Sequence, residues 1–525
     1  MSNASTVLLE KAEKHSKRTQ EIASSSLSRL PDNLAIMVLI VVFIYAAIRA
    51  YCLSLTHDEA ITFLNHARGS FFDIFTSQGD IPSNSHLFNT FLIKIFTNIF
   101  GISEFVIRAP ALIGLGLYLI GIYKILTLFL KKYSLFLGIC LLTWHPLILD
   151  LSSCARGYSL ALGFMILGLY YFLKSITCRT IGSAPPSYIL ASIMFALSAL
   201  SQFLFVNIYI SMVGVYVLFE LIILIQMKNF FHLGALYDAG KNILFGIFPS
   251  FILLLIFCSY PAMKLTRGNE GFWGGNNGFW RDTVGTLIVR TLNESFINSD
   301  IILFSKAVII ATLFLAFLII ICDMIRNRAL SPTDKYCICM LLLILISSLG
   351  IVTQHYLLNI PYPFDRYALY LIPTFFLIIL LFLPNIKFIG NQFIRTSVDI
   401  VTRFLIVCLL LMFIGQTSFT HFIQWKYDAS TKNVMDDIIA MNRNKTLPDD
   451  SVSLGINWLF EPSTNYYILK NNISWIRKTD RSGPVGKFDY YYVTPEYKNF
   501  LDKNNIKIIR QYETTGNYLA VSNPR

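Results

Sequence analysis

Long apolar runs recur along most of the chain and are separated by short polar segments. Each run approaches the roughly twenty residues that a helix needs to cross the hydrocarbon core of a bilayer. The stretch 188–225 is too long for one crossing, and we expect it to break near Phe205 and Val206. The segment 86–100 is apolar but short and interrupted, which favours an interfacial helix lying on the membrane. The pattern predicts about eleven membrane-spanning helices, over 34–53, 109–130, 135–149, 160–173, 188–205, 206–225, 243–260, 301–321, 337–352, 367–383 and 404–415.

Polar residues become frequent from Lys426 onward, as in a soluble domain. An amphipathic pattern predicts a helix over 430–442, and a second helix is expected over 495–503. Short β-rich runs predict strands over 451–456, 488–493, 506–512 and 518–521. We therefore expect an all-α polytopic membrane domain over 34–420, followed by a small α/β domain over 426–525.

The charge pattern predicts the orientation of the chain. Of its 525 residues, 55% are hydrophobic and only 14% are charged, and the formal net charge is +12. Lysines and arginines precede the first span and recur in alternate loops, as the positive-inside rule requires when residues 1–33 are cytoplasmic. An odd number of spans then places the C-terminal domain and the loop after the first span outside the cytoplasm. The positive charge therefore reflects membrane topology and does not indicate nucleic-acid binding. The sequence also shows no nucleotide-binding motif.

Asp58 and Glu59 lie directly after the first span. Ionised side chains are costly in hydrocarbon, so carboxylates at the membrane rim usually bind a partner or take part in chemistry. They can also simply mark the polar end of a helix. Asp58 is the candidate general base, with a pKa raised by its position at the membrane rim beside the second carboxylate. Adjacent helical residues point about 100° apart, so Glu59 is expected to position the loop or an arginine.

Further polar motifs follow in the outer loops. They are Gly79-Asp80, Ser85-His86-Leu87, Arg108-Ala-Pro-Ala-Leu-Ile-Gly114, His145-Pro146, Ala155-Arg156-Gly157-Tyr158, and Asp365-Arg366-Tyr367 followed by Pro373. In this order and on one side of the membrane, the series resembles the GT-C class of membrane glycosyltransferases, in the branch that includes protein O-mannosyltransferases and the lipid A aminoarabinose transferase. The matching pieces span 34–373. Related sequences usually show His-Pro-Pro where this chain has His86-Leu87, which leaves the role of His86 open.

The resemblance implies a multi-pass protein of a bacterial plasma membrane. Such a protein transfers a sugar from a polyprenyl-phosphate donor to an extracytoplasmic glycan, lipid or protein, with inversion at the anomeric carbon. The donor phosphate is expected to bind Arg108, Arg156 and Arg366, because arginine forms charge-assisted hydrogen bonds at the headgroup level. Snorkelling towards bulk lipid phosphate is the alternative for each arginine.

A divalent cation is the one candidate cofactor, since carboxylates suit hard metals. Its candidate ligands are Asp58, Glu59 and Asp80, although Asp80 can equally be a solvated turn residue. His86 and His145 could bind metal or donate to the leaving phosphate, but a lone histidine is more often a satisfied polar side chain.

Secondary site candidates come from the same outer loops. Tyr158 and Tyr367 follow arginines within their motifs, and Arg267 and Arg281 flank a loop rich in glycine, asparagine and tryptophan. Aromatic residues of this loop could stack on a sugar or simply belong to the membrane belt; they are Phe272, Trp273, Phe279 and Trp280.

Two other classes of protein compete with the enzyme. A transporter or lipid-linked sugar flippase should carry charges near mid-membrane, whereas the charged residues here cluster at the ends of the spans. A scaffolding protein would not require polar motifs concentrated on one side of the membrane. The sequence leaves the sugar, the acceptor and the oligomeric state open.

Overall fold

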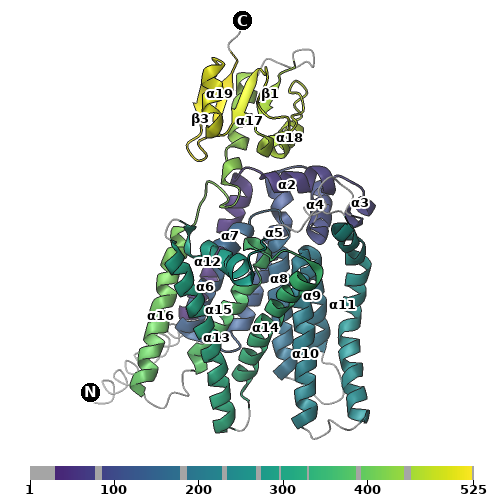
Figure 1. The fold of residues 1–525 in the computed structure, drawn as a ribbon, viewed down its shortest axis with the longest axis vertical. Coiled ribbons are helices and arrows are strands. Elements are labelled where there is room, and N and C mark those ends of the chain that lie inside the picture. The colour runs from purple at the N-terminus through teal and green to yellow at the C-terminus, as the bar shows by residue number, and fades with distance from the viewer. Residues whose placement is uncertain are drawn as a thin grey trace, which may run out of the picture.

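The computed structural model describes residues 30–76, 86–177, 186–226, 233–267, 274–294, 297–327, 330–385, 392–442 and 451–522. They form a bundle of long helices with a small α/β domain at one end (Figure 1). Eight of the described helices are long and apolar enough to cross a membrane, as an integral multi-pass protein requires. They are Leu30–Cys52, α5 (Glu104–Leu126), α8 (Tyr158–Thr177), α10 (Val206–Gln226), α11 (Leu233–Arg267), α13 (Ser299–Asn327), α14 (Pro332–Leu358) and α16 (Gln392–Gly415).

Shorter apolar helices complete the bundle. These are α4 (Leu87–Phe100), α6 (Lys132–Thr143), α9 (Pro186–Ser201) and α15 (Leu371–Asn385). Their length is below that of a full crossing. The expected total of about eleven spans therefore stays a prediction.

The long apolar run 188–225 breaks where the sequence predicts it. Helix α9 ends at Ser201, a 3-10 turn η3 (Phe203–Phe205) follows, and α10 begins at Val206. The prediction of one helix over 135–149 is wrong. Helix α6 ends at Thr143 and a separate helix α7 (Pro146–Leu151) begins with proline. Proline suits the first turn of a helix, where its missing N–H has no intrahelical partner to lose, but not the interior.

Short elements cover the end of the bundle that faces the α/β domain. The first loop forms α2 (His57–Ile61), a π-helical turn η1 (Thr62–Ala67) and α3 (Phe71–Phe75), and then continues into α4. Further along the chain, η4 (Phe279–Val284), α12 (Gly285–Leu292) and η6 (Asp365–Ala368) occupy loops of the same kind. Segment 86–100 is thus helical as expected, while its position relative to the membrane stays a prediction.

The C-terminal domain has the predicted helices and strands. The elements are η8 (Lys426–Asp428), α17 (Thr431–Met441), β1 (Leu454–Ile456), η10 (Trp458–Phe460), α18 (Glu461–Lys470), β2 (Tyr490–Val493), η11 (Pro495–Tyr497), α19 (Lys498–Lys503), β3 (Lys507–Gln511) and β4 (Tyr518–Val521). The strands pair in the order β1-β2-β4-β3, with β1 and β2 parallel and the other pairs antiparallel. Helix α18, which the sequence interpretation missed, forms the crossover between the parallel strands.

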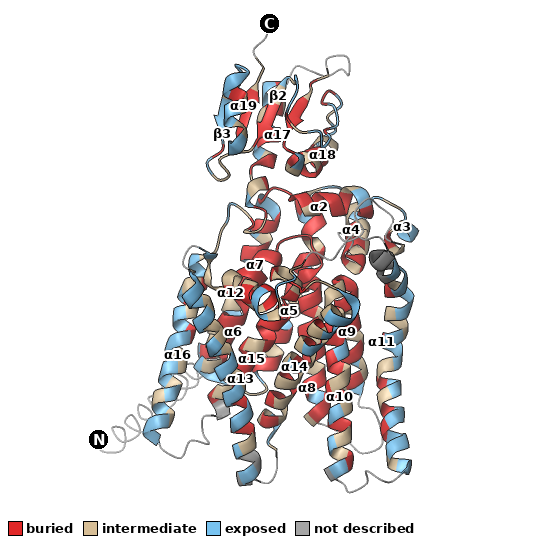
Figure 2. Ribbon diagram, in the orientation of Figure 1, coloured by how far each residue is buried: buried red, intermediate tan, exposed pale blue. Residues whose placement is uncertain are grey.

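Burial divides the long helices into an inner and an outer set (Figure 2). The apolar windows of α5 and α8 are 61% buried, whereas those of α11, α13 and α16 are 17% buried. The outer helices therefore present apolar faces of the kind that lipid covers.

The α/β domain shares a hydrophobic core with the first loop. One cluster of buried side chains joins Ala60 and Phe63 of that loop to Tyr466 of α18 and to Met435 of α17. Polar contacts cross the same boundary: the hydroxyl of Tyr467 accepts from the backbone N–H of Leu55 at 2.9 Å. The domain is thus packed against the loop that carries Asp58 and Glu59.

Candidate active site

A capping box at the start of α2 sets the direction of the acidic pair. The hydroxyl of Thr56 caps the helix by accepting from the N–H of Glu59, and the Glu59 carboxylate accepts from the N–H of Thr56 at 2.9 Å. Glu59 is thereby turned into the protein. Asp58, one residue earlier, points in a different direction and remains 18% exposed.

Glu59 and Arg108 form a closed, fully buried ion pair. Two N–H groups of Arg108 donate to the carboxylate at 2.8 and 2.7 Å, and the N–H of Ala155 donates at 2.6 Å. The remaining guanidinium N–H groups donate to the carbonyls of Ala50, Leu53 and Ser54. Both side chains are 0% exposed.

This pair bears on the expectations for both residues. Arg108 was expected to bind the donor phosphate, but its N–H groups are directed to Glu59 and to backbone carbonyls, and no face is exposed. Glu59 is enclosed in the same pair and is 0% exposed. Its expected alternative role, to position an arginine and the loop, is the one that its contacts describe.

Asp58 lies between the other two predicted arginines. Its Oδ2 is 3.4 Å from Nη2 of Arg366 and 3.8 Å from Nη2 of Arg156. These distances exceed the 2.7–2.9 Å typical of a charge-assisted hydrogen bond. The three side chains meet although they come from the first loop, from the segment before α8, and from η6. The result is a cluster that is more loosely paired than Glu59 and Arg108, has more positive than negative charge, and is called the open cluster below.

The electrostatics of Asp58 differ from the sequence-based expectation. Burial raises the pKa of Asp58, but the charges of Arg156, Arg366 and His57 and a hydrogen bond from Trp425 together outweigh it, so the pKa lies below its ordinary value. The expectation of a raised pKa is therefore wrong for the substrate-free protein. The reason is tertiary, since Glu59 is neutralised by Arg108 and two positive groups are the nearest neighbours of Asp58 instead.

Close packing holds Arg156 in place. One guanidinium N–H donates to the hydroxyl of Thr62 at 3.1 Å, and the side chain is only 2% exposed. A Cβ on the next residue, Gly157, would lie 1.8 Å from the carbonyl oxygen of Ser201. Glycine is therefore required for the segment before α8 to approach the end of α9.

Arg366 is held by a segment of chain that sequence analysis did not consider. This segment, residues 416–430, runs from the end of α16 to the start of α17, overlaps the first residues of the α/β domain, and is called the linker below. Arg366 donates to Oε1 of Gln424 and stacks over the rings of Trp425 and Tyr367 at 4.8 and 5.3 Å. Tyr367, a secondary candidate from the sequence, thus contacts the guanidinium.

His86 and Tyr158 lie beside the arginines. Their ring centroids are 5.5 Å apart, and Tyr158 is fully buried next to Arg366. Burial, and then the charges of Arg156 and Arg366, hold the pKa of His86 well below its ordinary value. The lowered pKa favours the neutral imidazole, which makes His86 poorly suited to act as a general acid.

The remaining predicted residues are not brought to this cluster. Arg281 has an exposed side chain, and no contact among the described residues joins it to Asp58 or to the arginines. The ring of His145 packs against Phe376 and Phe413 and belongs to the bundle core. Other expectations lie outside what the structure describes, namely those for Asp80, Phe272, Trp273 and the side chain of Arg267.

The described carboxylates do not fit a metal site. Four N–H groups occupy the Glu59 carboxylate, and two guanidinium groups face Asp58. Cationic neighbours of this kind disfavour a second cation. Among the described residues, no group of three or more His, Cys, Asp or Glu side chains could hold a metal ion. No step below depends on a metal.

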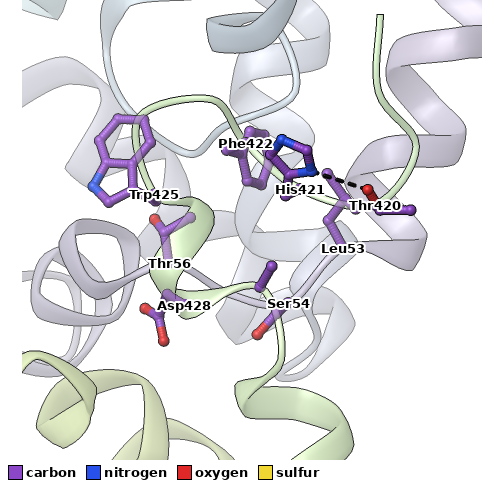
Figure 3. Close-up of a pocket in the computed structure, with 9 residues that line it drawn as sticks. Leu53, Ser54, Thr56, Thr420, His421, Phe422, Trp425 and Asp428 are labelled. Carbon is purple, nitrogen blue, oxygen red and sulfur yellow. Dashed lines mark hydrogen bonds between the residues drawn. The ribbon is translucent and has the colours of Figure 1, made fainter. Parts of the chain in front are cut away.

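The linker also contacts the first loop at a small pocket (Figure 3). Its lining includes Ser54 and Thr56 of the first loop and His421, Trp425 and Asp428 of the linker. Asp58 and the arginines are not part of this lining. We therefore assign the pocket to the packing of the linker rather than to the site.

Comparisons with known proteins were made for the whole chain. Neither a scan against known protein families nor a search of curated proteins finds a match. A similar solved structure is that of ArnT from Cupriavidus metallidurans bound to undecaprenyl phosphate, with 11% identity, 95% of this chain and 100% of that chain covered, and a TM-score of 0.42. Another is the Archaeoglobus fulgidus oligosaccharyltransferase tethered with an acceptor peptide, with 12% identity, 94% and 75% covered, and a TM-score of 0.46.

These solved proteins are GT-C glycosyltransferases, the class that the sequence motifs resemble. Identities and scores of this size carry no weight for function. The function is therefore inferred from the residues of the site.

Proposed function

We propose that this protein is a membrane glycosyltransferase that takes a sugar from a polyprenyl-phosphate donor and transfers it to an acceptor outside the cytoplasm. The observation that supports this most directly is the open cluster of Asp58, Arg156 and Arg366. It combines a partly exposed carboxylate with two guanidinium groups at the end of the helices. A base beside two phosphate-binding cations is what such a transfer needs.

The arginines would bind the donor phosphate. Arg156 and Arg366 each hold a guanidinium within 4 Å of Asp58 without forming a tight ion pair. A phosphate oxygen that enters the cluster can form shorter charge-assisted hydrogen bonds than Asp58 does. The contrast with Arg108, whose pair with Glu59 is closed, favours Arg156 and Arg366 over Arg108 as the ligand-binding arginines.

Asp58 would act as the general base. The acceptor hydroxyl attacks the anomeric carbon and transfers its proton to Asp58, while the bond between that carbon and the phosphate oxygen breaks. The electron pair stays on the phosphate, whose added negative charge is stabilised by Arg156 and Arg366. A single displacement of this kind inverts the anomeric centre.

Donor binding would also adjust the basicity of Asp58. In the free protein the two arginines keep its pKa low, so the carboxylate is ionised and ready to accept a proton. A phosphate that pairs with Arg156 and Arg366 compensates their charge and adds its own. The pKa of Asp58 should then rise towards the range in which a carboxylate is an efficient base.

The purified protein in detergent provides the test. It is incubated with a panel of polyprenyl-phosphate sugars labelled in the sugar, with and without candidate acceptors. Transfer of label, or its slow release to water, supports the enzyme. The alternative is a flippase, and it is supported instead if reconstituted protein moves the labelled lipid across a bilayer and no donor in the panel loses its sugar.

A further inference from the structure

The amide of Gln424 points one hydrogen-bonding group at Arg366 and leaves another unused. Oε1 accepts from Nη1 of Arg366, and because a guanidinium only donates, this contact settles which end of the amide faces it. Nε2 is therefore the end of the amide that Arg366 does not occupy. It is buried and has no hydrogen-bond acceptor among the described residues. A buried amide donor without a partner is costly, which suggests that a ligand supplies the acceptor.

The backbone around Gln424 is fixed, so the amide is held in place. The N–H of the preceding Ile423 donates to Asp150 at 3.1 Å. The ring of Phe422 is buried and lies 4.9 Å from the guanidinium of Arg49 and 5.0 Å from that of Arg108. On the other side of Gln424, Trp425 is 3% exposed and stacks under Arg366.

We propose that Gln424 is a ligand-binding residue of the donor site, and that its amide N–H group donates to an oxygen of the donor phosphate held by Arg366. The inference rests on the proposed function and extends it. The phosphate contacts then come from three parts of the chain, and one of them is the linker to the α/β domain. The linker contacts Arg366 through Gln424 and Trp425 before the chain enters that domain.

Binding of undecaprenyl phosphate to the full-length protein in detergent tests the proposal. Gln424→Met keeps the length of the side chain and removes both hydrogen-bonding groups. We expect it to weaken binding roughly tenfold, as for a lost hydrogen bond to a charged group. Lys426→Met is the matched control, because Lys426 is an exposed residue of the same linker, and it should bind like the wild type.

A double-mutant cycle separates direct contact from mere positioning of Arg366. If Gln424 donates to the phosphate itself, Gln424→Met should still weaken binding in an Arg366→Met background. If it acts only through Arg366, the second substitution has no further effect there, and the proposal is overturned. Unchanged melting of the variants confirms that the comparison is between folded proteins. Should Gln424→Met fail to fold, Gln424→Asn replaces it in the same cycle.

The remaining outcomes identify the source of the phosphate and separate the two proposals. If Gln424→Met weakens the binding of phosphatidic acid as much as that of undecaprenyl phosphate, the contact is to a phosphate monoester in general. Dependence with undecaprenyl phosphate alone assigns it to the carrier, and both results support the contact. If Gln424→Met and the wild type bind undecaprenyl phosphate with equal affinity, this inference alone is overturned. Wild-type protein that binds neither lipid overturns the proposed function as well.

Discussion

The carboxylate of Asp58 lies 3.4 Å from the guanidinium of Arg366, although 308 residues separate them along the chain. The neighbouring Glu59 is bound to Arg108 at 2.7 Å and is closed to solvent. Two adjacent carboxylates thus serve different purposes, one in an open cluster and one in a buried pair. This division predicts different consequences of substitution at each residue.

Asp58→Asn is expected to abolish transfer while folding and donor binding are retained. Asparagine is nearly isosteric but does not accept a proton at neutral pH. General-base catalysis typically contributes about 10²–10⁴-fold, and about that much rate should be lost. Turnover is measured at saturating donor, so that a binding defect is not mistaken for a chemical one. Retention of more than about a tenth of wild-type turnover would place the base elsewhere.

Glu59→Gln is expected to destabilise the protein. It leaves the guanidinium of Arg108 buried without its counter-charge, and breaking such a buried pair costs about 3–5 kcal/mol. The melting temperature in detergent should fall clearly, whereas Asp58→Asn should melt close to the wild type. A Glu59→Gln protein that melts normally but transfers no sugar would assign Glu59 to the chemistry and contradict the structural role.

Arg156→Ala and Arg366→Ala are expected to weaken donor binding with the fold intact. Each loses a charge-assisted contact to phosphate, which corresponds to roughly ten- to a hundredfold in affinity. The loss at Arg366 can be smaller if Arg156 shares the phosphate. Titration with undecaprenyl phosphate measures both. Arg281→Ala is the control, since its exposed side chain has no described contact with the cluster.

Stability of the α/β domain should depend on the protonation of Asp428. This linker carboxyl is buried and accepts from the hydroxyls of Thr431 and Ser463, and burial raises its pKa to about 7. In the unfolded chain the pKa is about 4. Between about pH 4 and about pH 7 the folded state therefore holds a proton on Asp428 that the unfolded chain has lost. The stabilisation that this proton provides is complete below about pH 4 and is lost as pH rises through about 7.

Asp428→Asn mimics the neutral carboxyl and should flatten this dependence. Melting temperatures between about pH 5 and pH 9 should then fall less with rising pH than in the wild type. Asp502→Asn, which changes an exposed carboxylate of α19, should leave the profile unchanged. A profile that is as steep in Asp428→Asn as in the wild type would show that another group titrates.

The α/β domain is expected outside the cytoplasm. The prediction follows from the odd number of spans expected from the sequence and from the cytoplasmic N-terminus that the charge pattern indicates. A cysteine placed at the exposed Ser482 should react with a membrane-impermeant thiol reagent in intact cells. Unmodified protein is the control, because it already contains nine cysteines. Labelling only after permeabilisation would show that the topology is the opposite one and that the site lies on the cytoplasmic side.

The sequence by itself determined the elements whose signal is local. Apolar length predicted most of the long helices, the break before Val206, and the helices and strands of the C-terminal domain. Local signals that were overlooked include Pro146, which begins a new helix, and the Thr56-x-x-Glu59 capping box. Such local patterns suffice to predict helices and their ends, because they depend on hydrogen bonds between residues a few positions apart.

Tertiary structure alone decided which charges meet. Arg108, Arg156 and Arg366 stand in similar motifs at the ends of apolar runs, yet the first closes on Glu59 and the other two face Asp58. The pKa of Asp58 and the contact between Gln424 and Arg366 follow from the same packing. No local pattern encodes them, because electrostatic partners depend on distances in space between segments that are hundreds of residues apart.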